Sequence, residues 1–285
     1  MKRNHAIHVS MTVLAVSAGS IAGVAARIAL LRSAVNFFPS SSQLSVNMVG
    51  SFVIGVIFGV KDLEKLTPWT HAALTVGFCG SFTTFSSWIY SMLKPSADWS
   101  IELLTGITIP IAALIFGRDI AQATVRAFAG PKDSPDEKEV EHNRIMDYGI
   151  VALLSVAAIA TSIPMVVTGN VSSSDMIACA IGPLGALTRW VLCTVLNAKS
   201  NYFMMGTFAS NLLGCLIAGA LGSCKTTNDW CNYSVVGIAG SLSTVSSWAL
   251  DTVKLHSARS PEWAYFYYLF SVAVGVAVVI PFSPN

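Results

Sequence analysis

A run of hydroxyl side chains between glycines, set in an otherwise apolar segment, is the part of this sequence best suited to binding an ion. It spans residues 76–88 (VGFCGSFTTFSSW) and returns as residues 236–248 (VGIAGSLSTVSSW), with eight of the thirteen positions identical. Glycine weakens a helix, and Ser and Thr hydroxyls compete for its carbonyls. We therefore expect both segments to be broken helices. Each break frees backbone carbonyls that suit one cation held by both copies, beside hydroxyl donors that suit an anion.

Aromatic rings accompany the hydroxyls in the first copy. Phe82, Phe85 and Trp88 are spaced i, i+3 and i+6, so they form one stripe on a helix. Ring edges carry partial positive charge, and together with hydroxyl donors they can replace water around a small anion. Packing against lipid or a neighbouring helix is the simpler explanation for such a stripe. The second copy keeps only the tryptophan, because the matching residues are Leu242, Val245 and Trp248. The two copies are therefore not expected to be functionally equal.

Two more polar positions repeat in the same order. Asn47 corresponds to Asn211 at an offset of 164, and Arg27 corresponds to Arg189 at an offset of 162. Three matched landmarks indicate two copies of one structural unit. The asparagine amides are able to contact either an anion or the broken backbone. For both arginines we favour a structural or vestibule role over direct ion binding.

The composition indicates a membrane protein. The chain has 285 residues, of which 53% are hydrophobic and 11% charged, and its mean hydropathy is +0.63, whereas soluble chains carry roughly 25% charged residues. A net charge of +2 gives no reason to expect a nucleic-acid partner. No nucleophile–base pair, phosphate loop or metal-ligand cluster is apparent in the sequence, so an enzyme is not expected. The carboxylates, Asp251 included, are expected near helix ends, which argues against a proton- or cation-coupled carrier.

Nine apolar segments are long enough to span a bilayer, which takes about 20 residues each. The predicted spans are residues 7–31, 43–60, 70–93, 100–118, 148–168, 176–197, 203–223, 232–254 and 262–282. The apolar run after Lys2 and Arg3 is long and lacks a clear cleavage site, so we interpret it as the first span and not as a signal peptide.

The odd number of spans determines the predicted fold: an all-α integral membrane protein of two inverted four-helix repeats joined by a linker transmembrane helix. Residues 1–128 form the first repeat, 129–170 a polar linker with its helix, and 171–285 the second repeat. Cytoplasmic loops are enriched in Lys and Arg. With the N-terminus inside and the C-terminus outside, twelve of these residues lie on inner segments. Three lie on outer loops, namely Arg32, Lys94 and Lys225.

The cysteines leave one question open. Four of the six lie in apolar segments, where cysteine is usually a small packing residue. Cys224 and Cys231 bracket a short polar loop, and they are able to pair if that loop is extracellular.

These residues together resemble a known family. The run Gly-Phe-Cys-Gly-Ser-Phe-Thr-Thr-Phe-Ser-Ser (77–87), the upstream segment 46–52 and the Gly23-x-x-x-Arg27 pattern are similar to the Fluc/FEX (CrcB-like) fluoride channels. The likeness covers nearly the whole chain and is of the eukaryotic, fused two-domain kind. It implies a fluoride-selective passive anion channel that exports cytosolic fluoride for detoxification. The alternative is a secondary active transporter of a small ion or drug, built on inverted repeats.

The resemblance also implies site residues. A structural Na⁺ would be held by the backbone carbonyls of four residues, Gly80, Thr83, Gly240 and Ser243. One pore would combine Phe85 with Trp248, and the other would combine Val245 with Trp88. The ring lost at Val245 predicts one working pore and one degenerate pore. The remaining implied pore residues are Asn47 and Asn211, with a polar track formed by Thr84, Ser87, Thr244 and Ser247. Phe82 is not assigned to the ion path.

Partners and location follow from the same resemblance. Fluoride and the lipid bilayer are the expected partners, and a monomer suffices because both repeats are fused. The expected location is the plasma membrane, as a multi-pass protein. Hydrofluoric acid crosses membranes uncharged and ionises in the cytosol. A passive pore then expels the anion, because a negative-inside potential contributes about 2.3 kcal/mol per charge per 100 mV. Nothing in the residues themselves distinguishes fluoride from chloride or nitrate.

Overall fold

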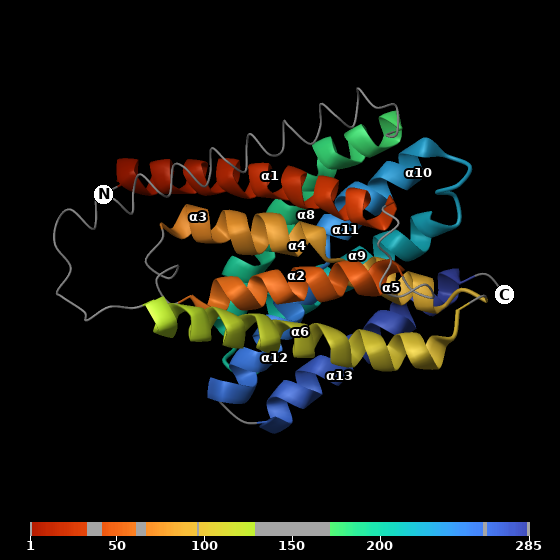
Figure 1. Ribbon diagram of the computed structural model, residues 1–285. Helices are drawn as coiled ribbons and strands as arrows, with labels where there is room; N and C mark the ends of the chain where they lie inside the picture. The colour runs from red at the N-terminus through yellow and green to blue at the C-terminus, as the bar shows by residue number, and fades with distance from the viewer. Residues whose placement is uncertain are drawn as a thin grey trace.

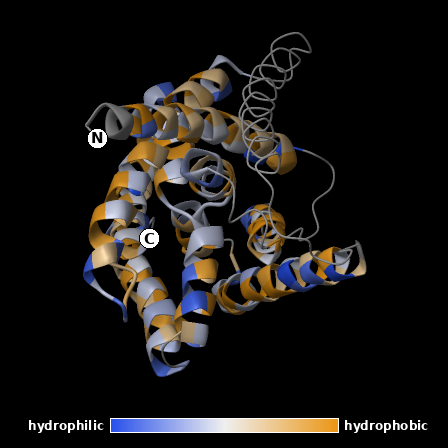
Figure 2. Ribbon diagram, turned by 90° about the vertical axis from the view of Figure 1, so that its left-hand side faces the viewer, coloured by the Kyte–Doolittle hydropathy of each residue, from blue (hydrophilic) through white to orange (hydrophobic). Residues whose placement is uncertain are grey.

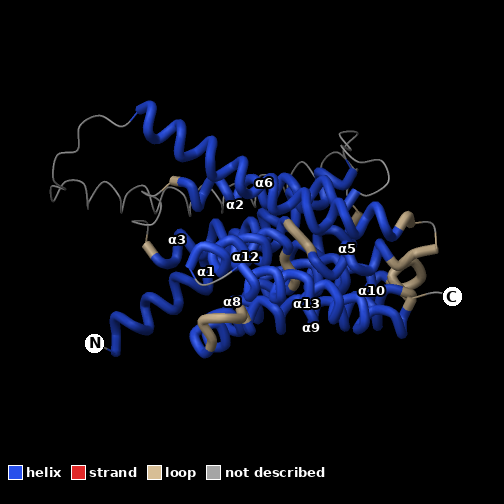
Figure 3. The backbone as a smooth tube through the Cα atoms, turned by 90° about the horizontal axis from the view of Figure 1, so that it is seen from below, coloured by secondary structure: helices blue, strands red, loops and turns tan. Residues whose placement is uncertain are grey.

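The computed structural model describes residues 2–32, 42–60, 67–95, 97–128, 172–258 and 261–283. Throughout this part of the chain the regular structure is helical, with short connecting loops (Figure 3). The predicted linker helix at residues 148–168 and the polar segment before it lie outside the described residues.

The first half contains three continuous helices and one interrupted helix. The continuous helices are α1 (Lys2–Arg32), α2 (Ser42–Gly59) and α6 (Trp99–Phe128). The interrupted helix comprises α3 (Pro68–Ala72), the π-helical η2 (Ala73–Cys79), α4 (Gly80–Phe82) and α5 (Phe85–Met92). The predicted spans agree with these bounds, except that α6 continues ten residues beyond the expected end at residue 118.

The second half repeats this order. Its continuous helices are α8 (Ser173–Leu196), α9 (Met205–Gly222) and α13 (Pro261–Val279). The interrupted helix comprises α10 (Asp229–Tyr233), η4 (Ser234–Ala239), α11 (Gly240–Leu242) and α12 (Val245–Ala258). Short 3₁₀ turns follow α8 and α13, at η3 (Asn197–Lys199) and η5 (Ile280–Phe282).

Helix length and composition support a protein that crosses a membrane several times. Five described helices are long and apolar enough to do so, with a shorter apolar helix at Gln43–Gly59. The five are Ile7–Arg32, Trp99–Ala127, Ser173–Lys199, Met205–Gly222 and Pro261–Phe282. Hydrophobic residues cover much of the length of the helices (Figure 2). Large side chains such as Leu104, Leu184 and Leu269 are more than half exposed, as expected for a surface that faces lipid.

The first helices of the two halves, α1 and α8, run in opposite directions. Arg32, at the end of α1, forms an ion pair of 2.6 Å with Asp175 in the first turn of α8. Farther along, Gly182 of α8 faces Ser20 and Val24 of α1. The helices are therefore antiparallel neighbours. The start of α1 and the end of α13 lie at opposite ends of the molecule (Figures 1 and 3).

A glycine on each first helix allows the interrupted helix to lie against it. A side chain at Gly23 would collide with the backbone of Phe78 and Phe82. A side chain at Gly185 would collide with the backbone of Ile238 and Leu242, the matching pair in the second half. The same close approach therefore holds both interrupted helices in place, which explains why the Gly-x-x-x-Arg pattern repeats.

One sequence prediction is wrong. Asp251 is not near a helix end, because α12 extends from Val245 to Ala258 and places it in the middle. The sequence segmentation ended this helix at residue 254, and the actual helix continues for another turn. Asp251 is partly buried and accepts a 2.6 Å hydrogen bond from the Thr207 hydroxyl of α9. The hydrogen bond allows a carboxylate to lie among apolar helices.

Candidate functional site

Each interrupted helix breaks at a pair of hydroxyl residues. Thr83 (φ −87°, ψ 155°) and Thr84 (φ −146°, ψ 118°) are extended, and α5 begins directly after them. In the second half, Ser243 (φ −95°, ψ 150°) and Thr244 separate α11 from α12 in the same way. The break expected from the glycine and hydroxyl pattern is therefore present in both copies.

An asparagine holds each break open. The Asn47 amide accepts a hydrogen bond from the Thr84 backbone N–H (3.0 Å) and donates one to the Thr84 carbonyl (3.3 Å). Asn211 forms the same pair with Thr244, at 2.7 Å and 3.2 Å. The sequence allowed these amides to contact either an anion or the broken backbone. In the structure they contact the broken backbone of their own half.

These bonds release four backbone carbonyls. In a continuous helix the Thr84 N–H would bond to the Gly80 carbonyl, four residues earlier. The Ser87 N–H would likewise bond to the Thr83 carbonyl, but it bonds to the Thr84 hydroxyl instead (3.3 Å). The second half diverts the N–H groups of Thr244 and Ser247 in the same manner. The carbonyls freed from their helical partners therefore include those of the four residues implied for a cation, Gly80, Thr83, Gly240 and Ser243.

Hydroxyl side chains join the two breaks to each other. The Ser86 backbone N–H donates to the Ser243 hydroxyl (3.1 Å), and the Ser246 N–H donates to the Thr83 hydroxyl (3.2 Å). The Thr83 hydroxyl also lies 3.1 Å from the Thr244 hydroxyl. All five residues are almost fully buried. A polar core shared by both halves thus lies inside an apolar shell, so the two breaks meet where the halves cross.

Two buried arginines clamp the crossing. The Arg27 guanidinium donates to the carbonyls of Gly240 (2.8 Å) and Val236, in the opposite half. Arg189 donates to the carbonyls of Ser241 (3.0 Å) and, in the opposite half, Val76 (2.8 Å). Both side chains are at most 2% exposed. These contacts favour a structural role, since each guanidinium satisfies buried backbone carbonyls of the interrupted helices.

Three aromatic rings meet beside the crossing. The Phe85 ring lies edge-on to Trp88 (centroids 5.5 Å apart) and to Trp248 (5.1 Å). Trp248 stacks on Tyr268 at 3.7 Å. Val245 is buried in the same cluster. Phe82 lies apart from this cluster and stacks on Phe78. The structure therefore brings together rings from both halves, with Phe85 and Trp248 in direct contact.

The two tryptophans use their indole N–H groups differently. Trp88 donates to the Glu102 carbonyl at 3.2 Å. The Trp248 N–H is buried and has no hydrogen-bond partner among the described residues. A buried donor left without a partner costs about 1–3 kcal/mol, so the Trp248 N–H is available to an ion next to Phe85.

A polar cavity of about 360 Å³, which we name the vestibule, opens between the halves near the end of α1. It is lined by three cationic side chains and one acidic side chain, Arg27, Lys94, Lys225 and Glu102. Its other polar walls are Gln43, Ser87, Tyr90 and Ser91. The Gln43 carbonyl oxygen is buried with no hydrogen-bond partner in the part of the chain described here. Excess positive charge at the entrance of a low-dielectric cleft concentrates anions.

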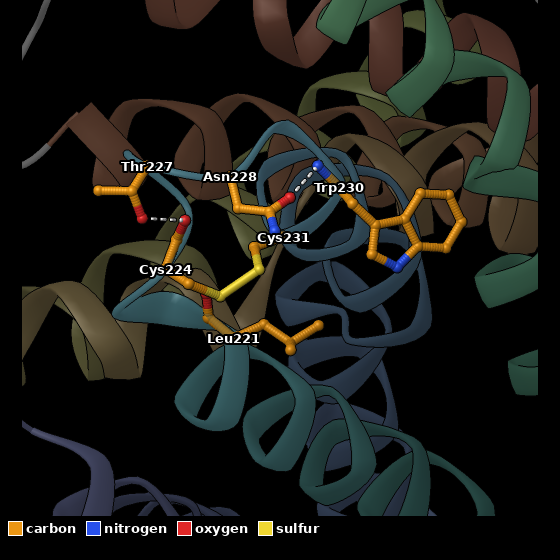
Figure 4. Close-up of a disulfide and its surroundings, with 6 residues drawn as sticks. All are labelled: Leu221, Cys224, Thr227, Asn228, Trp230 and Cys231. Atoms are coloured by element: carbon orange, nitrogen blue, oxygen red, sulfur yellow. Dashed lines mark hydrogen bonds between the residues drawn. A yellow bond between two sulfur atoms is a disulfide. The ribbon is translucent and has the colours of Figure 1, made fainter.

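A disulfide holds the loop that carries one of these cations. Cys224 and Cys231 are bonded (Figure 4), which answers the question that the sequence left open. Lys225 follows directly, and its ammonium lies 5.9 Å from the centroid of the Tyr90 ring. Burial, and then the like charge of Lys94, lower the pKa of Lys225. The loop therefore places a positive charge over the vestibule.

Sequence reasoning missed the polar groups at the ends of the helices. Lys94 and Lys225 appeared only as loop charges, and Glu102 appeared only as a carboxylate near a helix end, yet all three line the vestibule. Asp251 was expected near a helix end. The sequence did contain a signal for these positions, because the repeat offset of 160 aligns Ser91 with Asp251 and Lys94 with Lys254.

The fold and the site define a helical membrane protein of two repeats, whose interrupted helices cross at a buried polar centre. The chain belongs to the family described as "CrcB-like protein, Camphor Resistance (CrcB)", because that family's profile matches residues 14–118 and again residues 176–281. The two matches confirm the resemblance and the presence of two copies. This is a family of channels and not of enzymes.

Relatives in the family carry one name. A "Fluoride-specific ion channel FluC" from Campylobacter jejuni (strain 81-176) is 36% identical over 85 residues, which is 29% of this chain and 70% of the relative. A protein of the same name from Chlorobium phaeobacteroides is 35% identical over 117 residues, covering 38% of this chain and 91% of the relative. One from Prosthecochloris aestuarii is 42% identical over 84 residues, which cover 28% of this chain and 65% of the relative. No solved structure matches the chain.

Proposed function

We propose that this protein is a passive fluoride channel that lets cytosolic fluoride leave the cell. The observation that carries the proposal is the buried crossing of two interrupted helices, where hydroxyls, ring edges and freed carbonyls meet inside an apolar shell. Such a centre supplies hydrogen-bond donors to a small dehydrated anion without a fixed strong cation. The names of the relatives add the identity of the anion.

The working pore combines Phe85 with Trp248. Their rings are in contact, and the indole N–H of Trp248 is free to donate. In the other pairing the ring is replaced by Val245, and the Trp88 N–H is bonded to a backbone carbonyl. Thr84 and Ser87 form the polar track of the working pore, while Thr244 and Ser247 are their counterparts in the degenerate one. Asn47 and Asn211 support both tracks through the broken backbone.

A structural Na⁺ fits the crossing. The candidate ligands are four neutral carbonyl oxygens freed from helical bonding, and hard oxygen donors suit an alkali cation. Gly240 shares its carbonyl with Arg27, and a carbonyl has two lone pairs, so it is able to serve both. A bound cation there would neutralise the carbonyl dipoles that converge from both halves and would strengthen the contact between them.

The proposed topology has nine spans, with residues 1–128 and 171–285 as inverted repeats and 129–170 as the linker. The N-terminus lies inside and the C-terminus outside. The antiparallel contact of α1 with α8 and the opposite positions of the start of α1 and the end of α13 support inversion. One chain then suffices as a monomer, and the plasma membrane is the proposed location because an exporter must face the exterior.

Fluoride efflux from liposomes tests the proposal. Purified protein is reconstituted at equal inner and outer pH, and valinomycin with a K⁺ gradient sets the voltage. We expect fast fluoride efflux that follows the voltage, little chloride efflux, and loss of flux in Phe85→Ile. Protein that is correctly folded but passes no fluoride would exclude a channel.

One observation favours the alternative of a secondary transporter. Asp251 is a partly buried carboxylate in the middle of α12, the kind of group on which proton coupling depends. The same liposomes distinguish the two functions. Fluoride movement that requires a pH gradient at zero voltage would support the transporter, whereas movement driven by voltage alone supports the channel.

A further inference from the structure

The vestibule has a counterpart in the second half that is built from different residues. Three of its wall residues, Leu31, Gln43 and Ser91, correspond through the repeat to Cys193, Thr207 and Asp251. These three counterparts contact one another. The Thr207 hydroxyl donates to the Asp251 carboxylate at 2.6 Å, and the Cys193 sulfur lies 3.6 Å from the same hydroxyl.

The difference is a bridge between two helices. In the first half, the Ser91 hydroxyl donates to the Trp88 carbonyl of its own helix, and Ser91 and Gln43, the counterpart of Thr207, both line the open vestibule. In the second half, Asp251 reaches from α12 to Thr207 at the start of α9. Thr207 is 1% exposed. The hydrogen-bonded bridge therefore joins two residues whose counterparts in the first half, Ser91 and Gln43, line an open cavity.

The charges of the second half differ as well. Lys254, the counterpart of Lys94, has its ammonium 5.3 Å from the centroid of the Phe58 ring. It lines a cavity with Arg118 and Ser257, and Asp251 and Thr207 are not among the walls of that cavity. A carboxylate thus stands where the vestibule has a serine, and like charge repels an anion most strongly where water is scarce.

We propose that Asp251 and Thr207 close the second ion path: their bridge blocks the cavity, and the carboxylate repels anions. This inference rests on the proposed function. It gives the inactivity of the second ion path a further cause, in addition to the aromatic ring that is missing at Val245. Replacing the ring alone is then insufficient to open the path.

A reciprocal exchange tests this assignment, with fluoride efflux from liposomes as the readout. Ser91→Asp moves the carboxylate into the vestibule, and Ser91→Asn is the matched neutral control of similar size. We expect Ser91→Asp to lower efflux about tenfold or more, which corresponds to about 1.4 kcal/mol of barrier. We expect Ser91→Asn to stay within about threefold of wild type. Equal efflux in both variants would overturn the role of the charge.

The second arm opens the closed path after the first is disabled. Phe85→Ile/Val245→Phe restores the ring only, and adding Asp251→Ser removes the bridge. We expect the triple variant to conduct about tenfold faster than the double variant. A triple variant that elutes as folded protein and conducts no faster would overturn the proposal. Absence of flux in wild type would instead refute the channel function, so the two failures are distinguishable.

Discussion

Trp88 and Trp248 occupy the same position of the repeat, and their indole groups differ in what they contact. The Trp88 N–H bonds to the Glu102 carbonyl, whereas the Trp248 N–H is buried beside Phe85 with no partner among the described residues. The side-chain type is the same in both copies and does not explain the difference. The neighbouring helix determines whether the indole N–H finds a partner, because the tight packing of Trp88 against Gly106 of α6 brings its ring next to a backbone carbonyl.

Replacing each indole by phenyl separates a pore donor from a structural one. Trp248→Phe keeps a ring next to Phe85 and removes its N–H. Because hydrogen bonds to charged groups contribute about 1.5–3 kcal/mol, we expect fluoride efflux to fall roughly tenfold. Trp88→Phe should change efflux much less, since its N–H is used inside the protein. Equal losses in the two variants, measured in matched liposomes, would contradict a donor role for Trp248.

Lys225 gives the vestibule a dependence on external pH. Burial, and then the charge of Lys94, lower its pKa, so it loses its proton at a lower pH than a free lysine. Its positive charge is present below that pKa and is lost as the pH rises through it. Raising the external pH from about 7 to about 10 should therefore slow fluoride flux. Lys225→Arg should keep the flux, because arginine remains protonated. An identical decline in both proteins would exclude Lys225.

At the scale of the helices, the breaks in the two interrupted helices organise the site. Each break diverts backbone N–H groups to an asparagine and a hydroxyl, and it frees carbonyls from their helical partners. Arg27 and Arg189 then bond to carbonyls near the opposite break. The site therefore depends on helix ends that lie within the protein, where the polar backbone must find partners.

Removing one asparagine should measure this dependence. Asn47→Ala leaves the N–H and carbonyl of Thr84 without their partners in a buried position. Each unsatisfied group costs about 1–3 kcal/mol, so we expect a clear loss of thermal stability in detergent. Asn228→Ala removes an exposed helix cap at Trp230 instead. It should cost less, at about 0.5–2 kcal/mol. A melting temperature lowered more by Asn228→Ala would contradict the assignment.

The repeat made the helices and their breaks predictable from the sequence, because glycines and hydroxyls mark each break in both copies. The contacts of Phe85 with Trp248 and the Cys224–Cys231 bond needed coordinates, since sequence spacing does not determine which helices face each other. Asp251 was misplaced for a similar reason. Its helix continues past the apolar run, and only the bond from Thr207 accounts for a carboxylate in that position.

At the scale of the molecule, the two halves form a single polar centre that neither builds alone. Thr83 and Ser243 each receive a backbone N–H from the other half. The vestibule likewise takes Arg27 and Ser87 from one half and Lys225 from the other. The proposed inversion accounts for this, because antiparallel repeats bring two breaks face to face at the same depth.

If the two repeats are inverted, particular loops of different halves must face the same side of the membrane. Lys94 and Lys225 belong to different halves and line one vestibule, so single cysteines at both positions should react with a membrane-impermeant thiol reagent added outside intact cells. Lys199→Cys and Ser257→Cys should react only after permeabilisation. Cys79, Cys179 and Cys215 are buried and Cys224 is paired with Cys231, so the half-buried free Cys193 is the native cysteine whose labelling the wild-type protein must control for. Disulfides persist in oxidising compartments, so the Cys224–Cys231 bond agrees with the proposed outside position of its loop. External labelling of Lys94→Cys without labelling of Lys225→Cys would mean that the repeats are parallel in the membrane, and the shared vestibule would have to be abandoned.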